Sequence, residues 1–178
     1  MPAELILTVT KFVENPSGTP PARPEDNCTL SDEITIVGAT GGEWKSDPAG
    51  EVFICPPPDV TTIAVKQKDA SKGPVLITFT LVSAANEPAL TPTRIVFQQQ
   101  NFHRNPKRPK DDPDGSRNFR DQRVKGGKLT FANHWIHRGK SRNRHERNAP
   151  AWKFWIQVKA ADGRMGWIDP TIENSEDM

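Results

Sequence analysis

The Asp169-Pro170 bond has unusual chemistry for a peptide bond. Its nitrogen belongs to a tertiary amide and becomes a better leaving group once it is protonated. The Asp169 carboxylate can attack its own carbonyl carbon, which would form a cyclic anhydride and release Pro170. Glu173 could donate the proton if burial or another carboxylate raised its pKa. The same residues also suit a plain strand end, because proline cannot continue a β-ladder.

A second chemical feature is a basic segment, residues 101–150. It holds 14 of the 24 Lys and Arg residues but only five of the 22 acids, so its net charge is +9 and that of the remainder is −7. Clustered cations can neutralise phosphates and release counterions. The sequence therefore predicts a polyanion site, for which we select Arg138, Lys140, Arg142, Arg144 and Arg147. A solvated loop or a contact with a neighbouring subunit would explain the same composition.

No metal or cofactor site is predicted. His134 and His137 are three residues apart, and in the extended conformation that we expect here they would point to opposite faces. Gly38–Gly42 lacks the lysine of a phosphate-binding loop and reads as a turn. Cys28 and Cys55 are expected to be free structural thiols, because no export signal points to an oxidising compartment.

The elements that must position these residues are short strands. Apolar and β-branched runs are separated by proline and glycine, and 17 prolines argue against long helices. We expect about nine strands in an all-β, antiparallel sandwich or barrel. The expected strands cover residues 5–13, 34–37, 51–55, 61–66, 75–81, 93–97, 128–131, 151–159 and 165–168. Residues 61–66 and 75–81 are expected to form a hairpin.

The strand at residues 151–159 alternates clearly. Trp152, Phe154, Ile156 and Val158 share one face, which predicts the core. Trp155 falls on the opposite face, and an exposed tryptophan there, together with edge strands that need cover, would favour a homo-oligomer. The Asp-Gly pair that follows predicts a tight hairpin with residues 165–168.

Length and hydropathy favour one domain over residues 1–178, with residues 101–150 as a long basic insertion. No stretch approaches the roughly 20 apolar residues that a membrane span needs. We therefore expect a cytoplasmic protein that does not enter a membrane.

The run Gly166–Asn174, placed after an alternating strand and an Asp-Gly turn, resembles the C-terminal signature of the bacterial DP-EP family. The resemblance implies a small β-sandwich or barrel and aspartic-type self-cleavage. It would make Asp169 the cleaving acid, Pro170 the new amino terminus and Glu173 a helper. This chain differs from the family pattern in two ways: its Glu-Pro pair, Glu87-Pro88, lies upstream, and the basic insertion lengthens it.

Two functions follow as hypotheses. The first is a non-enzymatic binding or assembly module whose basic segment contacts a polyanion or a neighbouring subunit. The alternative is a self-cleaving peptidase acting on its own Asp169-Pro170 bond.

Overall fold

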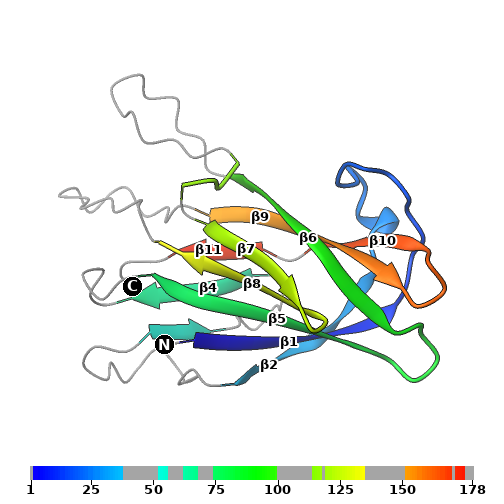
Figure 1. Ribbon diagram of the computed structural model, residues 1–178, viewed down its shortest axis with the longest axis horizontal. Helices are drawn as coiled ribbons and strands as arrows, with labels where there is room; N and C mark the ends of the chain where they lie inside the picture. The colour runs from blue at the N-terminus through cyan, green and yellow to red at the C-terminus, as the bar shows by residue number, and fades with distance from the viewer. Residues whose placement is uncertain are drawn as a thin grey trace.

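The computed structural model describes residues 2–37, 52–55, 62–67, 74–99, 114–117, 119–134, 151–169 and 171–174. These residues form eleven strands and one 3-10 turn, η1 (Pro24–Asp26). The two sheets that the strands form are visible in Figure 1. No helix within these ranges is long and apolar enough to cross a membrane. The expectation of an all-β chain is confirmed.

The first sheet, sheet A, has five strands, and its order brings together segments from both halves of the chain. Its outer strands are β2 at one edge and β7 at the other. The strands run in the order β2 (Thr29–Val37), β1 (Pro2–Lys11), β5 (Val75–Ser83), β8 (Lys128–Asn133) and β7 (Phe119–Lys125). β7 and β8 therefore build the middle of the basic segment into this sheet.

The second sheet, sheet B, has six strands arranged around β9. β6 pairs along one side of β9, while β10 and β11 pair with different parts of its other side. The path runs through β10 (Met165–Ile168), β9 (Ala151–Ala160), β11 (Thr171–Asn174), β4 (Thr62–Gln67) and β3 (Val52–Cys55), with β6 (Leu90–Gln99) beside β9. The side of β9 that faces the Asp-Pro motif is thus shared between two short strands.

The core lies between the two sheets and is dominated by phenylalanine. Phe79 and Phe131 come from sheet A, and Phe97 and Phe154 come from sheet B; all four are buried. The Phe79 and Phe154 ring centroids are 5.3 Å apart, as are those of Phe97 and Phe131. Because aromatic pairs at this separation attract beyond their buried area, these contacts join the two sheets. Phe119 of β7 adds a stacked ring on Phe97 at 4.0 Å.

Three expectations about the strands need correction. All nine expected strands are present, but β7 and β11 were missed. The fold is not purely antiparallel, because β1 pairs with β5 and β11 pairs with β4 in parallel. The expected hairpin of residues 61–66 and 75–81 is wrong, since β4 belongs to sheet B and β5 to sheet A. Alternation identified both strands but could not reveal their partners.

The expected hairpin of β9 and β10 is confirmed. Their register pairs Met165 with Lys159 and Ile168 with Ile156. Gly163 turns the chain with φ of 92°, a conformation that glycine adopts without strain.

Candidate functional site

Asp169 lies where β10 ends and is brought beside the connection between β1 and β2. Cys28 forms a bridge to Ile168, and its backbone N–H donates to the Trp167 carbonyl at 2.7 Å. This bridge extends sheet B by one residue and places Asn27 next to Asp169. Asp169 thus meets groups from segments far apart in the sequence.

The Asp169 carboxylate has two partners on one oxygen and none on the other. Lys153 Nζ lies 2.7 Å from Asp169 Oδ2, and Asn27 Nδ2 donates to the same oxygen at 3.5 Å. Asp169 Oδ1 and Asn27 Oδ1 are both buried and have no hydrogen-bond partner among the described residues. The Asp169 side chain is only 15% exposed. We name Asn27, Lys153 and Asp169 the carboxylate cluster.

Burial and charge act in opposite directions on Asp169. Burial raises the pKa of its carboxyl above the ordinary value of 3.8, while the hydrogen bond and the charge of Lys153 lower it. Burial is the larger effect, so the pKa is raised overall. The proton is therefore held to a higher pH than on an ordinary aspartate.

The prediction of an exposed tryptophan face on β9 is wrong for Trp155. This residue is 7% exposed, and Lys153 Nζ lies 5.0 Å above its ring. Its Nε1 is buried and has no partner within the described residues. The prediction of core residues on the other face is confirmed for Phe154, Ile156 and Val158, all fully buried, while the side chain of Trp152 lies outside the description.

A segment of residues 12–28 packs along β10 and was not anticipated. Trp167, on the face of β10 opposite the core residue Ile168, is fully buried, and its Nε1 donates to the Ser17 carbonyl at 3.1 Å. The Arg94 guanidinium lies 5.2 Å from the Trp167 ring centroid and donates to the Gly18 carbonyl. Asn15 N–H bonds to the Met165 carbonyl at 2.8 Å. We name residues 12–28 the covering segment.

Of the other predicted catalytic residues, only the backbone of Glu173 is described. It lies in β11, paired with Ala151 of β9 and Ala64 of β4. Extended backbone advances about 3.3 Å per residue, so Glu173 is two residues, or ~6.6 Å, beyond Thr171 along β11. Pro170 is outside the described residues, and the roles of Pro170 and Glu173 stay predictions. Sequence reasoning missed Lys153 and Asn27, which contact Asp169 directly.

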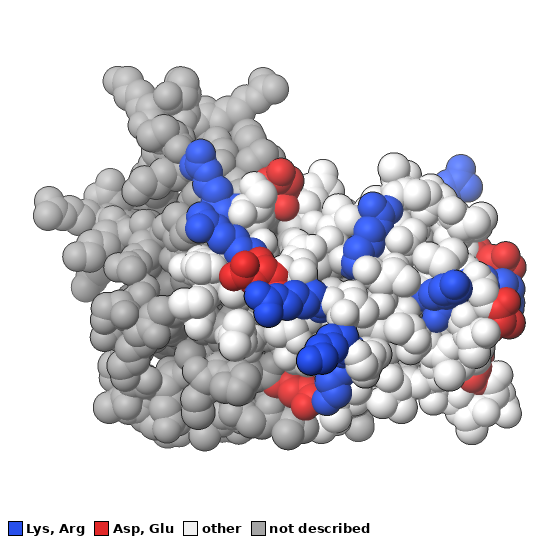
Figure 2. Space-filling model, viewed as in Figure 1, with Lys and Arg blue, Asp and Glu red and all other residues white. Residues whose placement is uncertain are grey.

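The second candidate site is the hairpin of β7 and β8. Gly126 and Gly127 form its turn with φ of 59° and 75°, the positive values that a tight hairpin requires. Its cations Arg120, Arg123 and Lys125 are exposed. Figure 2 shows basic side chains following the line of this hairpin, with acidic ones between them. The five cations selected from the sequence, Arg138, Lys140, Arg142, Arg144 and Arg147, lie outside the described residues.

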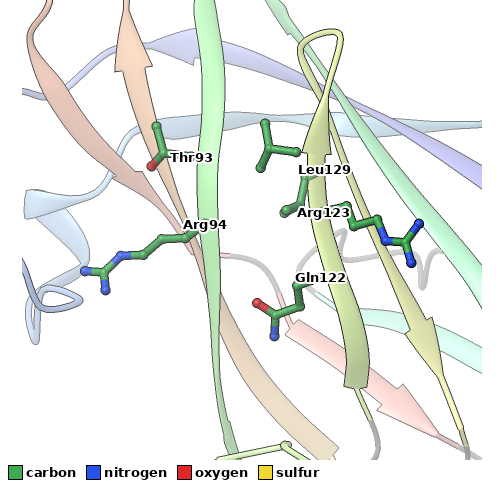
Figure 3. Close-up of a pocket in the computed structure, with 6 residues that line it drawn as sticks. Thr93, Arg94, Gln122, Arg123 and Leu129 are labelled. Carbon is green, nitrogen blue, oxygen red and sulfur yellow. The ribbon is translucent and has the colours of Figure 1, made fainter.

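A hollow of about 230 Å³ lies between β6 and β7 but has no convergent chemistry. It is lined by Thr93, Arg94, Gln122, Arg123, Val124 and Leu129. In Figure 3 the guanidinium groups of Arg94 and Arg123 point in opposite directions, away from the space between the strands. Small-molecule sites need several polar groups aimed at one point. Arg94 and Arg123 therefore do not make this hollow a binding site for a small molecule.

Metal chemistry has no visible basis in the part of the chain that the structure describes, since no three His, Cys, Asp or Glu side chains cluster there. Cys28 is a free, buried thiol, and burial raises its pKa.

Comparison with protein-family models gives no match for this chain. Comparison with curated proteins gives none either.

Proposed function

We propose that this protein is a non-enzymatic binding module whose basic segment contacts a polyanion. One observation carries the proposal: the middle of the segment folds as part of sheet A and holds Arg120, Arg123 and Lys125 at the surface. The strand fixes the backbone of these cations before they bind, so no backbone entropy is lost on binding, and this favours binding over a purely solvating role.

The burial of Trp155 bears on the choice of partner. An exposed tryptophan face was one of two reasons to expect a homo-oligomer, the other being edge strands that need cover, and Trp155 is covered within its own chain. A polyanion therefore accounts for the basic segment better than a neighbouring subunit does.

We also infer that the two sheets, with their shared phenylalanine core, form a β-sandwich of the kind that the DP-EP resemblance implies.

The test is retention on heparin and on nucleic acid over a range of salt concentrations. The parent protein should be retained at low salt and released as salt rises, because phosphate binding releases counterions. Replacing Arg138, Lys140, Arg142 and Arg144 by glutamine should weaken retention. Binding that does not respond to salt would contradict the proposal.

A second candidate is self-cleavage at Asp169-Pro170, which the raised pKa of Asp169 favours. A carboxyl whose pKa is raised keeps its proton to a higher pH than an ordinary aspartate and can pass it to the leaving proline nitrogen. Its carboxylate can then attack the adjacent carbonyl carbon, the C–N bond breaks to release Pro170, and water hydrolyses the resulting cyclic anhydride. Oδ1 of Asp169, which has no hydrogen-bond partner among the described residues, is the oxygen that would make that attack.

Intact mass tests this candidate. Self-cleavage would remove residues 170–178, about 1 kDa, from the parent at neutral pH but not from Asp169→Ala. Asp47-Pro48 and Asp112-Pro113 are internal controls. Cleavage only in acid, and equally at all three bonds, would show ordinary Asp-Pro lability instead.

A further inference from the structure

A bulge in β7 brings its cations to one face. Arg120 pairs with Ala132 and Arg123 with Thr130, so two residues of β7, 121 and 122, stand opposite the single residue 131 of β8. In a regular strand, residues three apart point to opposite faces. The extra residue restores alignment, because a bulge re-aims the side chains that follow it. Asp121, at the bulge, has a positive φ of 56°.

Lys125 joins the same face through its pairing with Lys128. The β8 partners Ala132, Thr130 and Lys128 alternate with the core residues Phe131 and Leu129, so this is the face of sheet A away from the core. Ala132 is buried but does not belong to the core cluster. We name Arg120, Arg123 and Lys125 the cation row. All three of its side chains are exposed.

Among the described residues, no carboxylate is paired with the cation row, whereas the neighbouring Lys128 has one. Lys128 is paired with Glu4 at 2.6 Å, and its hydrogen bond holds the pKa of Glu4 below the ordinary value. Within the described ranges, no ion pair involves Arg123 or Lys125. Arg120 uses its Nε to hold the Arg117 carbonyl at 3.0 Å, which orients its guanidinium. Among the described residues, the positive charge on this face is therefore concentrated along the single line of the cation row.

We infer that the cation row holds one nucleic-acid strand by its phosphates; the inference rests on the proposed polyanion function and names its partner. Residues two apart on a strand are separated by ~6.6 Å. This spacing is close to that of successive phosphorus atoms in a nucleic acid, which are joined by six backbone bonds. One row of cations matches one strand.

The cation row itself, within the described residues, offers no surface on which bases could stack. The large exposed apolar side chains in the described part of the molecule are Leu76, Val82 and Val124, none of them aromatic. Proteins that read or stack on unpaired bases use exposed aromatic rings. Binding through the cation row alone is therefore independent of base sequence.

An acidic peptide is the other partner that cations attract, but the edge of β7 is unsuited to adding a strand. The bulge interrupts the regular ladder, and charged side chains protect the edge against pairing. A phosphate backbone can bind to the cations without forming hydrogen bonds to the backbone of β7.

The experiment measures binding of fluorescent 20-nucleotide dT and dA oligomers to the full chain over a range of salt. The test variant carries Arg120→Gln, Arg123→Gln and Lys125→Gln. Its control carries Lys11→Gln, Arg23→Gln and Lys159→Gln, three exposed cations from other elements with the same change in net charge. Circular dichroism and the urea midpoint show whether each variant is folded.

The inference expects equal affinity for dT and dA. It also expects at least a tenfold loss in the cation-row variant, with the log–log salt slope reduced by about 2, since each phosphate contact with a single strand contributes about 0.7. The control variant should bind within twofold of the parent. Inorganic polyphosphate, whose phosphorus atoms are separated by only two bonds, should compete poorly at equal phosphate concentration.

Other outcomes overturn the inference in separable ways. Oligomer binding that both variants weaken equally would place the site elsewhere and leave the polyanion function intact. A tenfold preference between dT and dA would show base recognition. Preferential binding of polyphosphate or of a poly-glutamate peptide would show that the partner of the cation row is not a nucleic acid. No binding of any of these polyanions would end the proposed function together with the inference.

Discussion

The carboxylate cluster makes an asymmetric prediction about stability. Asp169 is 15% exposed and Lys153 is 33% exposed, so the aspartate depends more on its partner than the lysine does. Lys153→Met keeps the aliphatic stem over Trp155 but leaves a poorly hydrated carboxylate alone. Removing one partner of a fully buried pair costs 3–5 kcal/mol and an exposed pair is worth at most 1, so this intermediate pair should give about 2 kcal/mol.

Asp169→Asn should cost less than about 1 kcal/mol, because no charge is left behind in a buried place. The new amide also offers an N–H to Asn27 Oδ1, which has no partner among the described residues. Lys153 can turn its ammonium group to water. The double variant Lys153→Met, Asp169→Asn should recover most of the loss of Lys153→Met.

The loss of stability in Lys153→Met should increase with pH. A carboxyl whose pKa is raised in the folded state contributes stability below its unfolded pKa and loses that contribution as pH rises through the folded pKa. In Lys153→Met the pKa rises further, because Lys153 lowers it in the parent. The stability difference from the parent should therefore be small near the ordinary value of 3.8 and largest at neutral pH.

Urea unfolding followed by circular dichroism at pH 4, 5, 6 and 7 measures these differences. A change of 2 kcal/mol corresponds to a midpoint shift of about 1 M urea. An equal loss for Lys153→Met at every pH, or an equal loss for Asp169→Asn, would refute the reasoning that burial of the carboxylate dominates the cluster.

Three further substitutions test the packing, each by urea unfolding. Gly166→Ala should cost about 1–3 kcal/mol, because its Cβ would lie 2.7 Å from the Val13 carbonyl oxygen; Gly18→Ala, with nothing within 4 Å, is the matched control, and equal effects would contradict the close approach. Gly163→Ala, with open space but φ of +92°, should cost about 1 kcal/mol from backbone strain alone, and no loss would show that the turn can relax. Phe79→Ala should cost about 3–5 kcal/mol by opening a cavity between the sheets, and a loss below 1 kcal/mol would mean that the core collapses around it.

The strands themselves could be predicted because alternation and flanking proline or glycine act locally. The closing hairpin shows this well: Phe154, Ile156 and Val158 are buried as their spacing predicts, and Asp-Gly gives the turn. β7 was missed because, after Phe119, all of its side chains are exposed, so no buried alternation marks it. Strand partners could not be predicted, since the pairing of β1 with β5 depends on contacts about seventy residues apart.

The candidate sites show the same division between local and distant information. Asp169 could be identified from the sequence because the Asp-Pro bond joins two consecutive residues. Asn27 and Lys153 were missed because the bridge between Cys28 and Ile168 and the register of β9 bring them there. A lysine flanked by aromatic residues in an alternating strand was the available signal, but it does not name its partner. Trp167 was likewise buried by the covering segment rather than by the core.

Several described cations already stabilise the fold, and this favours a site on sheet A. Lys153 pairs with Asp169 and Arg94 packs on Trp167, so binding a phosphate at either would break interactions that stabilise the fold. The cation row has no ion pair to break in Arg123 and Lys125. If net charge alone attracted a polyanion, neutralising any three exposed cations would weaken binding equally. Only alignment by the bulge makes Arg120, Arg123 and Lys125 matter more than three cations scattered over other elements.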